Sequence, residues 1–329
     1  MYNKFGDFMV IPDYIKKVDS IGVTACSCGV LDKIDDYEKS LLKLKDYKVL
    51  ETNNVRTSGI VSSDKVTRAN ELMNLYKDKD IKGIMIASGG DFLLDMLDQI
   101  DYKVIKDNIK WICGSSDPTS LLYTITTKLD IATIYSPCNM GGLKVDDESI
   151  NNYLSILNGN LVKQYKRDKY ELNRSNLDKY CLDTQNEWIR NKDIDCSGIL
   201  IGGCIDCLKD IIGTRYDGTK EFINKYKDEG VIWYFDVFGL SSESLYNTLI
   251  QFKYAGYFEY TKLIVIGKVC FPNSFLELEY EDSIKKALEG YNYIYKFDVG
   301  HIKPSFTMIN GLKVRIVSNN NESSMEYIK

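Results

Sequence analysis

Two adjacent serines in this chain stand where a catalytic nucleophile could lie. Ser115 and Ser116 follow a short apolar run, residues 111–113, that is typical of the end of a buried strand. Pro118 and a second apolar run come next, and proline suits the first turn of a helix. A serine on such a strand-to-helix turn can attack a carbonyl carbon while backbone N–H groups stabilise the oxyanion. A serine-rich helix N-cap would have the same residues, and the spacing is not G-x-S-x-G, so the interpretation depends on partners elsewhere in the chain.

The chain contains one histidine, His301, which follows Gly300 at the end of a β-prone run, residues 291–301. Histidine is the most frequent general base near neutral pH. If this protein uses a serine nucleophile with a histidine base, that base is His301. The alternative is a histidine with no role in chemistry, and composition alone does not separate the two.

A single carboxylate, Asp236, interrupts the otherwise apolar segment at residues 230–237. A carboxylate in a buried strand costs free energy unless it is paired or lies at the end of the strand. Such a group could orient the imidazole of a base and stabilise its charged form. Asp298 and Asp206 are rival candidates for this role, and Asp236 could also merely begin the following loop.

Backbone donors for an oxyanion are expected at two places. Gly89 and Gly90 end an expected strand at residues 81–87, and glycine lets the backbone approach a substrate closely. Asp117 follows Ser116 directly, and its backbone N–H is more useful there than its carboxylate. We therefore expect Gly90 and Asp117 to supply the donors, although an ordinary strand-to-helix turn would also use paired glycines.

The elements that must position these residues alternate between strand and helix, which predicts an α/β fold with a doubly wound, mostly parallel sheet. In such sheets, sites form outside the carboxyl ends of the strands. The N-terminal strands are expected within 17–30 and at 48–50, 81–87 and 111–113, and the helices at 33–47, 64–78 (with Ser63 as N-cap) and 92–99. The C-terminal strands are expected at 198–203, 230–237, 262–268 and 291–301. The helices are expected to about residue 254, with Ser241 or Ser242 as N-cap, and at 281–289.

This pattern predicts two domains. Residues 1–145 would form the nucleophile domain, residues 146–195 a connecting segment with local helix, and residues 196–329 a smaller, β-rich α/β domain carrying the acid and the histidine.

The composition excludes several classes of function. Of 329 residues, 44% are hydrophobic and 27% charged, with a net charge of −5, which is an ordinary globular balance. The absence of a basic stripe disfavours nucleic-acid binding, and no apolar run is long enough for a membrane span. The N-terminus lacks a secretory signal pattern, so a cytoplasmic location is expected. Nine scattered cysteines with one histidine favour reduced thiols over a zinc site, and neither a metal nor a cofactor is expected.

Several short motifs follow one another in a particular order between about Val18 and Val317. An Arg-Ala-x-x-Leu pattern precedes paired glycines, and Ser-Asp, Gly-Gly and Gly-His follow. They lie at residues 62–91 (Arg68, Ala69, Leu72), 93–121 (Ser116, Asp117), 200–203 with Gly213-Thr214 after them, and 298–312 (Gly300, His301). The pattern resembles the serine peptidase family of LD-carboxypeptidases and microcin C immunity proteins.

The resemblance implies that Ser116 is the nucleophile and His301 the base. The family's acid is a glutamate at the end of a strand like 230–236, and Asp236 occupies that position. Three other residues depart from the family pattern: Ser115 replaces an aromatic residue, Cys204 an asparagine and Ile309 a proline.

The implied function is that of a serine peptidase or amidase that cleaves a terminal amide through an acyl-enzyme. Its substrate would be a murein peptide that loses a terminal D-amino acid, or a peptidyl-nucleotide antibiotic. An alternative, which rests on the shorter carboxylate of Asp236, is a weak or catalytically silent member that binds a peptide or muropeptide. The family also implies a homodimer.

Overall fold

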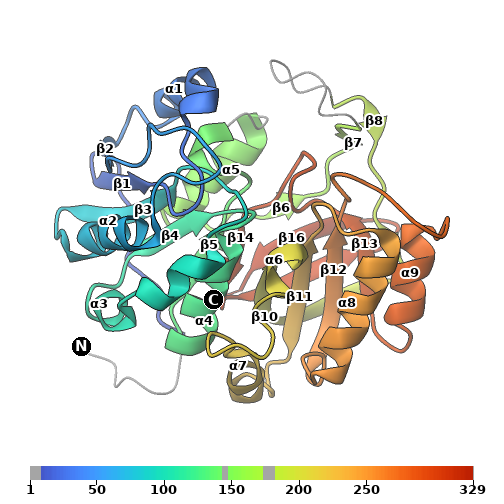
Figure 1. Cartoon of the computed structure of the whole chain (residues 1–329). Coiled ribbons are helices and arrows are strands. Elements are labelled where there is room, and N and C mark those ends of the chain that lie inside the picture. The colour runs from blue at the N-terminus through green and yellow to red at the C-terminus, as the bar shows by residue number, and fades with distance from the viewer. Residues whose placement is uncertain (1–8, 143–146, 173–181, 329) are drawn as a thin grey trace.

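The computed structural model describes residues 9–142, 147–172 and 182–328 and shows two β-sheets with helices packed around them (Figure 1). The first sheet has the strand order β14-β5-β4-β3-β1-β2 and is parallel except for β14, which pairs antiparallel with β5. Its strands are β1 (Ser20–Thr24), β2 (Lys48–Glu51), β3 (Ile81–Ile86), β4 (Trp111–Gly114), β5 (Thr133–Tyr135) and β14 (Met308–Asn310). The helices of this half are α1 (Ile34–Lys43), α2 (Lys65–Lys77), α3 (Tyr102–Asp107), α4 (Thr119–Leu129) and α5 (Asp147–Leu157).

The second sheet has the order β6-β16-β15-β10-β11-β12-β13-β9, with four parallel strands in its middle and antiparallel strands on both sides. The parallel strands are β10 (Ile194–Cys204), β11 (Val231–Asp236), β12 (Thr261–Gly267) and β13 (Tyr293–Phe297). The antiparallel strands are β6 (Gln164–Tyr165), β9 (Ile189–Arg190), β15 (Lys313–Ser318) and β16 (Ser323–Tyr327). The helices are α6 (Ile205–Leu208), α7 (Thr219–Lys225), α8 (Ser242–Tyr254) and α9 (Tyr280–Ala287).

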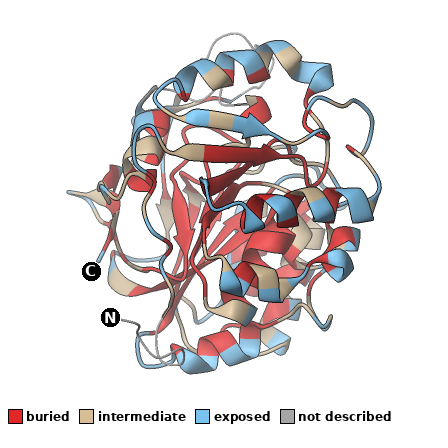
Figure 2. Cartoon of the chain, turned by 90° about the vertical axis from the view of Figure 1, so that its left-hand side faces the viewer, coloured by how far each residue is buried: buried red, intermediate tan, exposed pale blue. Residues whose placement is uncertain are grey.

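The parallel strands form because their residues are apolar almost without interruption. All six residues of β11 are buried, as are five of the six in β3, since helices cover both faces of a parallel sheet. Figure 2 shows the strands as a largely buried centre and the outer helices with one exposed face each. This arrangement leaves the carboxyl ends of the strands as the places where polar side chains can gather.

The predicted fold class is confirmed: the protein is a mixed α/β structure with parallel sheets in two domains. Three local predictions differ. The strand expected at 291–301 is β13, which ends at Phe297, so His301 lies in the loop that follows it. The helix expected at 92–99 is a 3-10 helix, η2 (Leu94–Gln99), and the cap of α2 is Asp64, not Ser63. Asp64 Oδ1 accepts the backbone N–H groups of Val66 and Thr67, both at 3.0 Å, and Oδ2 accepts the Thr67 hydroxyl, so one side chain satisfies the free donors of the first turn.

The predicted domain boundaries, 145/146 and 195/196, remain a prediction. The expected connecting segment contributes α5 and the edge strands β6 and β9, and it also carries the small hairpin of β7 (Lys169–Tyr170) and β8 (Thr184–Gln185). Strand β14, from the C-terminal part of the chain, crosses to the first sheet. Among the described residues, no helix has the length and apolarity that crossing a bilayer requires.

Candidate active site

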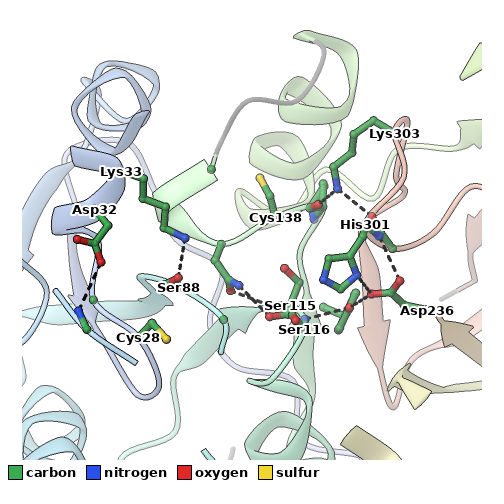
Figure 3. Close-up of a pocket in the computed structure, with 18 residues that line it drawn as sticks. Cys28, Asp32, Lys33, Ser88, Ser115, Ser116, Cys138, Asp236, His301 and Lys303 are labelled. Atoms are coloured by element: carbon green, nitrogen blue, oxygen red, sulfur yellow. Dashed lines mark hydrogen bonds and ion pairs between the residues drawn. The ribbon is translucent and has the colours of Figure 1, made fainter. Parts of the chain in front are cut away.

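A pocket of about 460 Å³ lies at the strand ends of both sheets (Figure 3). Strands β3, β4 and β5 lead into its lining on one side, and β11 and the segment after β13 on the other. Ser116, Asp236 and His301, which are far apart in the sequence, all line it. The structure thus brings the three residues singled out in the sequence into one cavity.

Ser116 lies on the turn between β4 and α4 in an unusual backbone conformation. Its φ is +67°, in the left-handed region that residues other than glycine rarely adopt. Its N–H donates to Tyr135 Oη at 3.0 Å, and its carbonyl accepts the N–H of Thr119 at 2.8 Å. The Oγ atom lies beside the first glycine pair, since a Cβ at Gly89 would be 3.2 Å from it. An unfavourable backbone conformation that the surrounding structure imposes is typical of functional sites.

The neighbouring serine has a different role. The backbone N–H of Ser115 donates to Asn139 Oδ1 at 2.9 Å, and Asn139 Nδ2 donates to the Ser115 carbonyl at 2.8 Å. Pro118 is the N-cap of α4, and no side chain caps this helix. The helix-cap interpretation of the two serines is therefore wrong.

Asp236 ends β11 and is fully buried against His301. Its Oδ2 lies 2.8 Å from His301 Nδ1, and its Oδ1 accepts the His301 backbone N–H at 3.1 Å. The carboxylate fits beside His301 because the residue before His301 is Gly300. A Cβ at Gly300, whose φ is +105°, would lie 2.0 Å from Asp236 Oδ1. Burial alone would raise the pKa of Asp236, but the imidazole and the hydroxyl of Tyr135, which also donates to Oδ2, hold that pKa below its ordinary value.

The His301 ring lies between the Asp236 carboxylate and the turn that carries the two serines (Figure 3). Phe238 packs on the imidazole, with ring centroids 4.7 Å apart. Within the described part of the chain, no hydrogen bond joins the Ser116 hydroxyl to this ring. The hydrogen bond between a nucleophile and its base is often long in the absence of substrate and shortens in the enzyme–substrate complex.

The rival carboxylates have other partners. Asp298 is buried in an ion pair with Lys268 at 2.7 Å and accepts the side-chain amide of Asn186. Asp206 accepts three backbone N–H groups, those of residues 238–240. Both carboxylates fix loops that adjoin the pocket, so Asp236 is left as the carboxylate that contacts His301.

The expected oxyanion donors lie near the serine turn. Within the described residues, neither the Gly90 nor the Asp117 backbone N–H donates a hydrogen bond. Gly89, however, is the glycine that lines the pocket, while Gly90 (φ +156°) packs against Ser27, where a Cβ would be 2.3 Å from Oγ. The Asp117 carboxylate accepts the Ser27 hydroxyl at 2.5 Å and the Leu93 N–H at 3.0 Å, and burial raises the pKa of this carboxyl.

Three further polar residues of the pocket belong to no motif that marks them in the sequence. Lys33 Nζ donates to Ser88 Oγ at 2.7 Å on the wall opposite His301 (Figure 3). Lys303 Nζ is buried and donates to the Gly300 carbonyl at 2.8 Å. Tyr135 connects the serine turn to Asp236. In the described parts of the chain, no three His, Cys, Asp or Glu side chains gather in a way that could hold a metal ion.

A serine on a strained strand-to-helix turn, with an Asp-bound imidazole in the same pocket of a two-domain α/β fold, is an arrangement that hydrolytic enzymes use. Comparison with family models places the chain: it belongs to the LD-carboxypeptidase family. Residues 21–136 match the LD-carboxypeptidase N-terminal domain and residues 197–316 the C-terminal domain. The family consists of serine-type carboxypeptidases, which are hydrolases.

Individual relatives are distant. A Vibrio cholerae protein provisionally named a carboxypeptidase is 27% identical over 192 residues, which are 54% of this chain and 56% of that protein, so this alignment spans about half of either one. The microcin C7 self-immunity protein MccF of Escherichia coli is 26% identical over 276 residues, 78% of this chain and 77% of that protein.

Solved structures share the fold over nearly the whole chain. The wild-type apo form of the microcin C7 self-immunity protein MccF superposes with a TM-score of 0.83 at 21% identity, covering 97% of this chain and 98% of that one. A muramoyltetrapeptide carboxypeptidase from Oxalobacter formigenes has a TM-score of 0.73 at 16% identity, covering 94% and 99%. At these identities the likeness shows the fold alone.

Proposed function

We propose that this protein is a serine peptidase that cleaves a terminal amide through an acyl-enzyme, with Ser116 as nucleophile, His301 as base and Asp236 as the orienting acid. The observation that carries the proposal is the 2.8 Å contact between Asp236 Oδ2 and His301 Nδ1 in the pocket that Ser116 lines. This contact fixes the ring so that its other nitrogen is the one available to a proton donor.

In the proposed reaction, His301 Nε2 takes the proton of Ser116 as Oγ attacks the amide carbonyl carbon. The backbone N–H of Gly90, which belongs to the peptide that joins it to the pocket residue Gly89, and the backbone N–H of Asp117 stabilise the oxyanion. The imidazolium then gives the proton to the leaving amine, and the C–N bond breaks. Water, deprotonated by His301, releases the acyl group and restores Ser116. The lowered pKa of Asp236 keeps this carboxylate ionised, so it stabilises the imidazolium throughout.

The aspartate at 236 does not prevent this chemistry. An aspartate is one methylene shorter than the family's glutamate, but it lies at the end of β11 and meets both the ring and the backbone N–H of His301. Gly300 leaves the space for that approach. These contacts support an active member over a silent one.

Two substrate classes are proposed, because relatives of both kinds share the fold. Solved complexes of MccF contain glutamyl sulfamoyl guanosine or aspartyl sulfamoyl adenosine, while the Oxalobacter formigenes structure is a muramoyltetrapeptide carboxypeptidase. The pocket presents charges of both signs, Asp32 and Lys33 on one wall and Lys303 on another, which suits a zwitterionic peptide end in either class. Assaying a muramyl tetrapeptide and an aminoacyl-sulfamoyl adenosine in parallel would separate them.

A fluorophosphonate probe tests the nucleophile without knowledge of the substrate. We expect labelling of the wild type and of Ser115→Ala but none of Ser116→Ala. Labelling of folded Ser116→Ala at the wild-type rate would contradict the proposal. If the folded wild type binds a muropeptide but is neither labelled nor active, the protein is a peptide-binding member instead. The homodimer and the cytoplasmic location remain predictions, and light scattering of the purified chain tests the first.

A further inference from the structure

The hydroxyl of Tyr135 touches both halves of the pocket. Tyr135 ends β5 and is 1% exposed. Its Oη accepts the N–H of Ser116 at 3.0 Å and donates to Asp236 Oδ2. One oxygen atom therefore connects the nucleophile turn of the first sheet with the carboxylate that ends a strand of the second.

The chemistry of the phenol fixes the direction of these hydrogen bonds. Burial, together with the nearby charge of Asp236, raises the pKa of Tyr135 well above its ordinary value. The hydroxyl therefore keeps its proton, which it donates to the carboxylate, and its lone pair accepts the Ser116 N–H. Neither bond can reverse, because a backbone N–H only donates and an ionised carboxylate only accepts.

Each of the two hydrogen bonds of Tyr135 stabilises a part of the site, the Ser116 turn in one case and the Asp236 carboxylate in the other. Ser116 is held at φ +67°, a conformation that persists only when its surroundings impose it. Strand pairing places Tyr135 opposite Gly114, two residues before the nucleophile, so the ring reaches over the turn. Asp236 shares Oδ2 between His301 Nδ1 and the phenol, which fixes the plane of a carboxylate that has only one methylene of reach.

We propose that Tyr135 is a positioning residue for the reaction, whose hydroxyl sets the Ser116 turn and the Asp236 carboxylate in register across the domain boundary. The inference rests on the proposed function of Ser116, His301 and Asp236. It explains how an aspartate serves where the family has a glutamate: the second donor on Oδ2 restrains the shorter side chain toward the imidazole.

Labelling kinetics with a fluorophosphonate probe test this role. In Tyr135→Phe we expect the maximal labelling rate constant to fall roughly 10- to 100-fold, the effect of one hydrogen bond to a charged group, while half-saturation by the probe stays nearly constant. Tyr234→Phe is the matched control. Tyr234 is buried with its ring 5.7 Å from that of Tyr135, and its hydroxyl bonds to neither Ser116 nor Asp236 among the described contacts, so its rate should stay within about twofold.

Two further readouts separate positioning from mere packing. Loss of labelling on acidification should begin at a higher pH in Tyr135→Phe. Without the phenol's hydrogen bond, the charge of Asp236 is less neutralised and stabilises the imidazolium, which is the unreactive form of the base, more strongly. The titratable groups that face Asp236 are His301, Tyr135, Tyr234, Cys204 and Cys207. Tyr135→Phe should also cost less in an Asp236→Asn background than in the wild type, since the two groups act together.

The outcomes are distinct. A Tyr135→Phe protein that labels like the wild type, or that loses rate with an unchanged pH profile and full additivity with Asp236→Asn, overturns the inference while Ser116→Ala remains unlabelled. A labelled Ser116→Ala, or an unlabelled wild type, overturns the proposed function and the inference with it. Thermal unfolding of each variant shows that the compared proteins are folded.

Discussion

The two sides of the pocket are built in different ways. On the first-sheet side, Ser116 lies on a left-handed turn between β4 and α4 and is held through its backbone, whose N–H and carbonyl both make hydrogen bonds. On the second-sheet side, Asp236 ends β11 and His301 lies in the loop after β13, and what holds them is side-chain complementarity. Strain is stored in the backbone of the first, and space is reserved by a missing Cβ, at Gly300, in the second.

This difference predicts how each side fails. Where the backbone holds the residue, as at Ser116, a substitution can remove the reactive hydroxyl while the turn keeps its structure. A side-chain-held pair depends on both partners and on the glycine that lets them meet, so small changes there disturb structure and chemistry together. Substitutions on the two sides should therefore separate activity from stability in opposite ways.

The largest effect is expected on the backbone-held side. Ser116→Ala removes the nucleophile and should lower kcat by up to about 10⁶-fold, as removal of a catalytic serine does in other systems. Its unfolding free energy should stay close to that of the wild type, because no hydrogen bond of the Ser116 side chain to described residues is lost. Turnover and urea unfolding check both parts. A stability loss that matched the activity loss would show that the Ser116 side chain also supports the fold.

The acid on the other side comes next. Asp236→Asn keeps the shape of the side chain but removes the charge that stabilises the imidazolium, so kcat should fall roughly 10⁴-fold. Unlike Ser116→Ala, this variant should also be destabilised, since Oδ2 lies against both Tyr135 and His301. It should lose less stability than the wild type on acidification. The pKa of Asp236 is lowered in the fold, so its contribution is present above the ordinary carboxyl pKa and is lost as the pH falls through the lowered one.

The sequence predicted the fold best where strands are apolar along their whole length. The expected strands at 81–87, 230–237 and 262–268 correspond to β3, β11 and β12, because burial on both faces leaves an unbroken hydrophobic run. Strands β5, β14, β15 and β16 and the two-residue strands were not predicted, since their pairing is decided by what lies beside them in space.

The site, too, could be predicted only where residues are marked by their own type and their neighbours in the sequence. Ser116, Asp236 and His301 carry residue types and flanking patterns that indicate their roles, and the structure brings them to one pocket. Tyr135 is one of 24 tyrosines, and nothing in its neighbours marks it. Its position matters only because β5 pairs beside β4 and ends facing the second sheet. That Gly89 lines the cavity while Gly90 packs against Ser27 likewise depends on the fold.

A glycine substitution tests the space reserved on the side-chain-held side. Gly300→Ala places a Cβ 2.0 Å from Asp236 Oδ1 at a φ of +105°. We expect a loss of about 1–3 kcal/mol of stability from strain and overpacking, and roughly 100-fold of activity as the carboxylate shifts. Gly290→Ala is the control: its φ is +88°, but a Cβ there meets nothing within 4 Å. Equal losses in the two variants would show that backbone strain alone, not the carboxylate, makes Gly300 necessary.

The smallest effect is expected from a pair of substitutions that measures the backbone strain at Ser116. Ser116→Gly relieves the left-handed conformation at φ +67°, whereas Ser116→Ala retains it, and both lack the nucleophile. Since strain relief outweighs the added freedom of glycine in the unfolded chain at such a position, the glycine variant should be more stable than the alanine variant by about 0.5–1 kcal/mol. Paired urea titrations measure the difference. If alanine is the more stable of the two, the turn is not under strain, and backbone strain does not distinguish the two sides of the pocket.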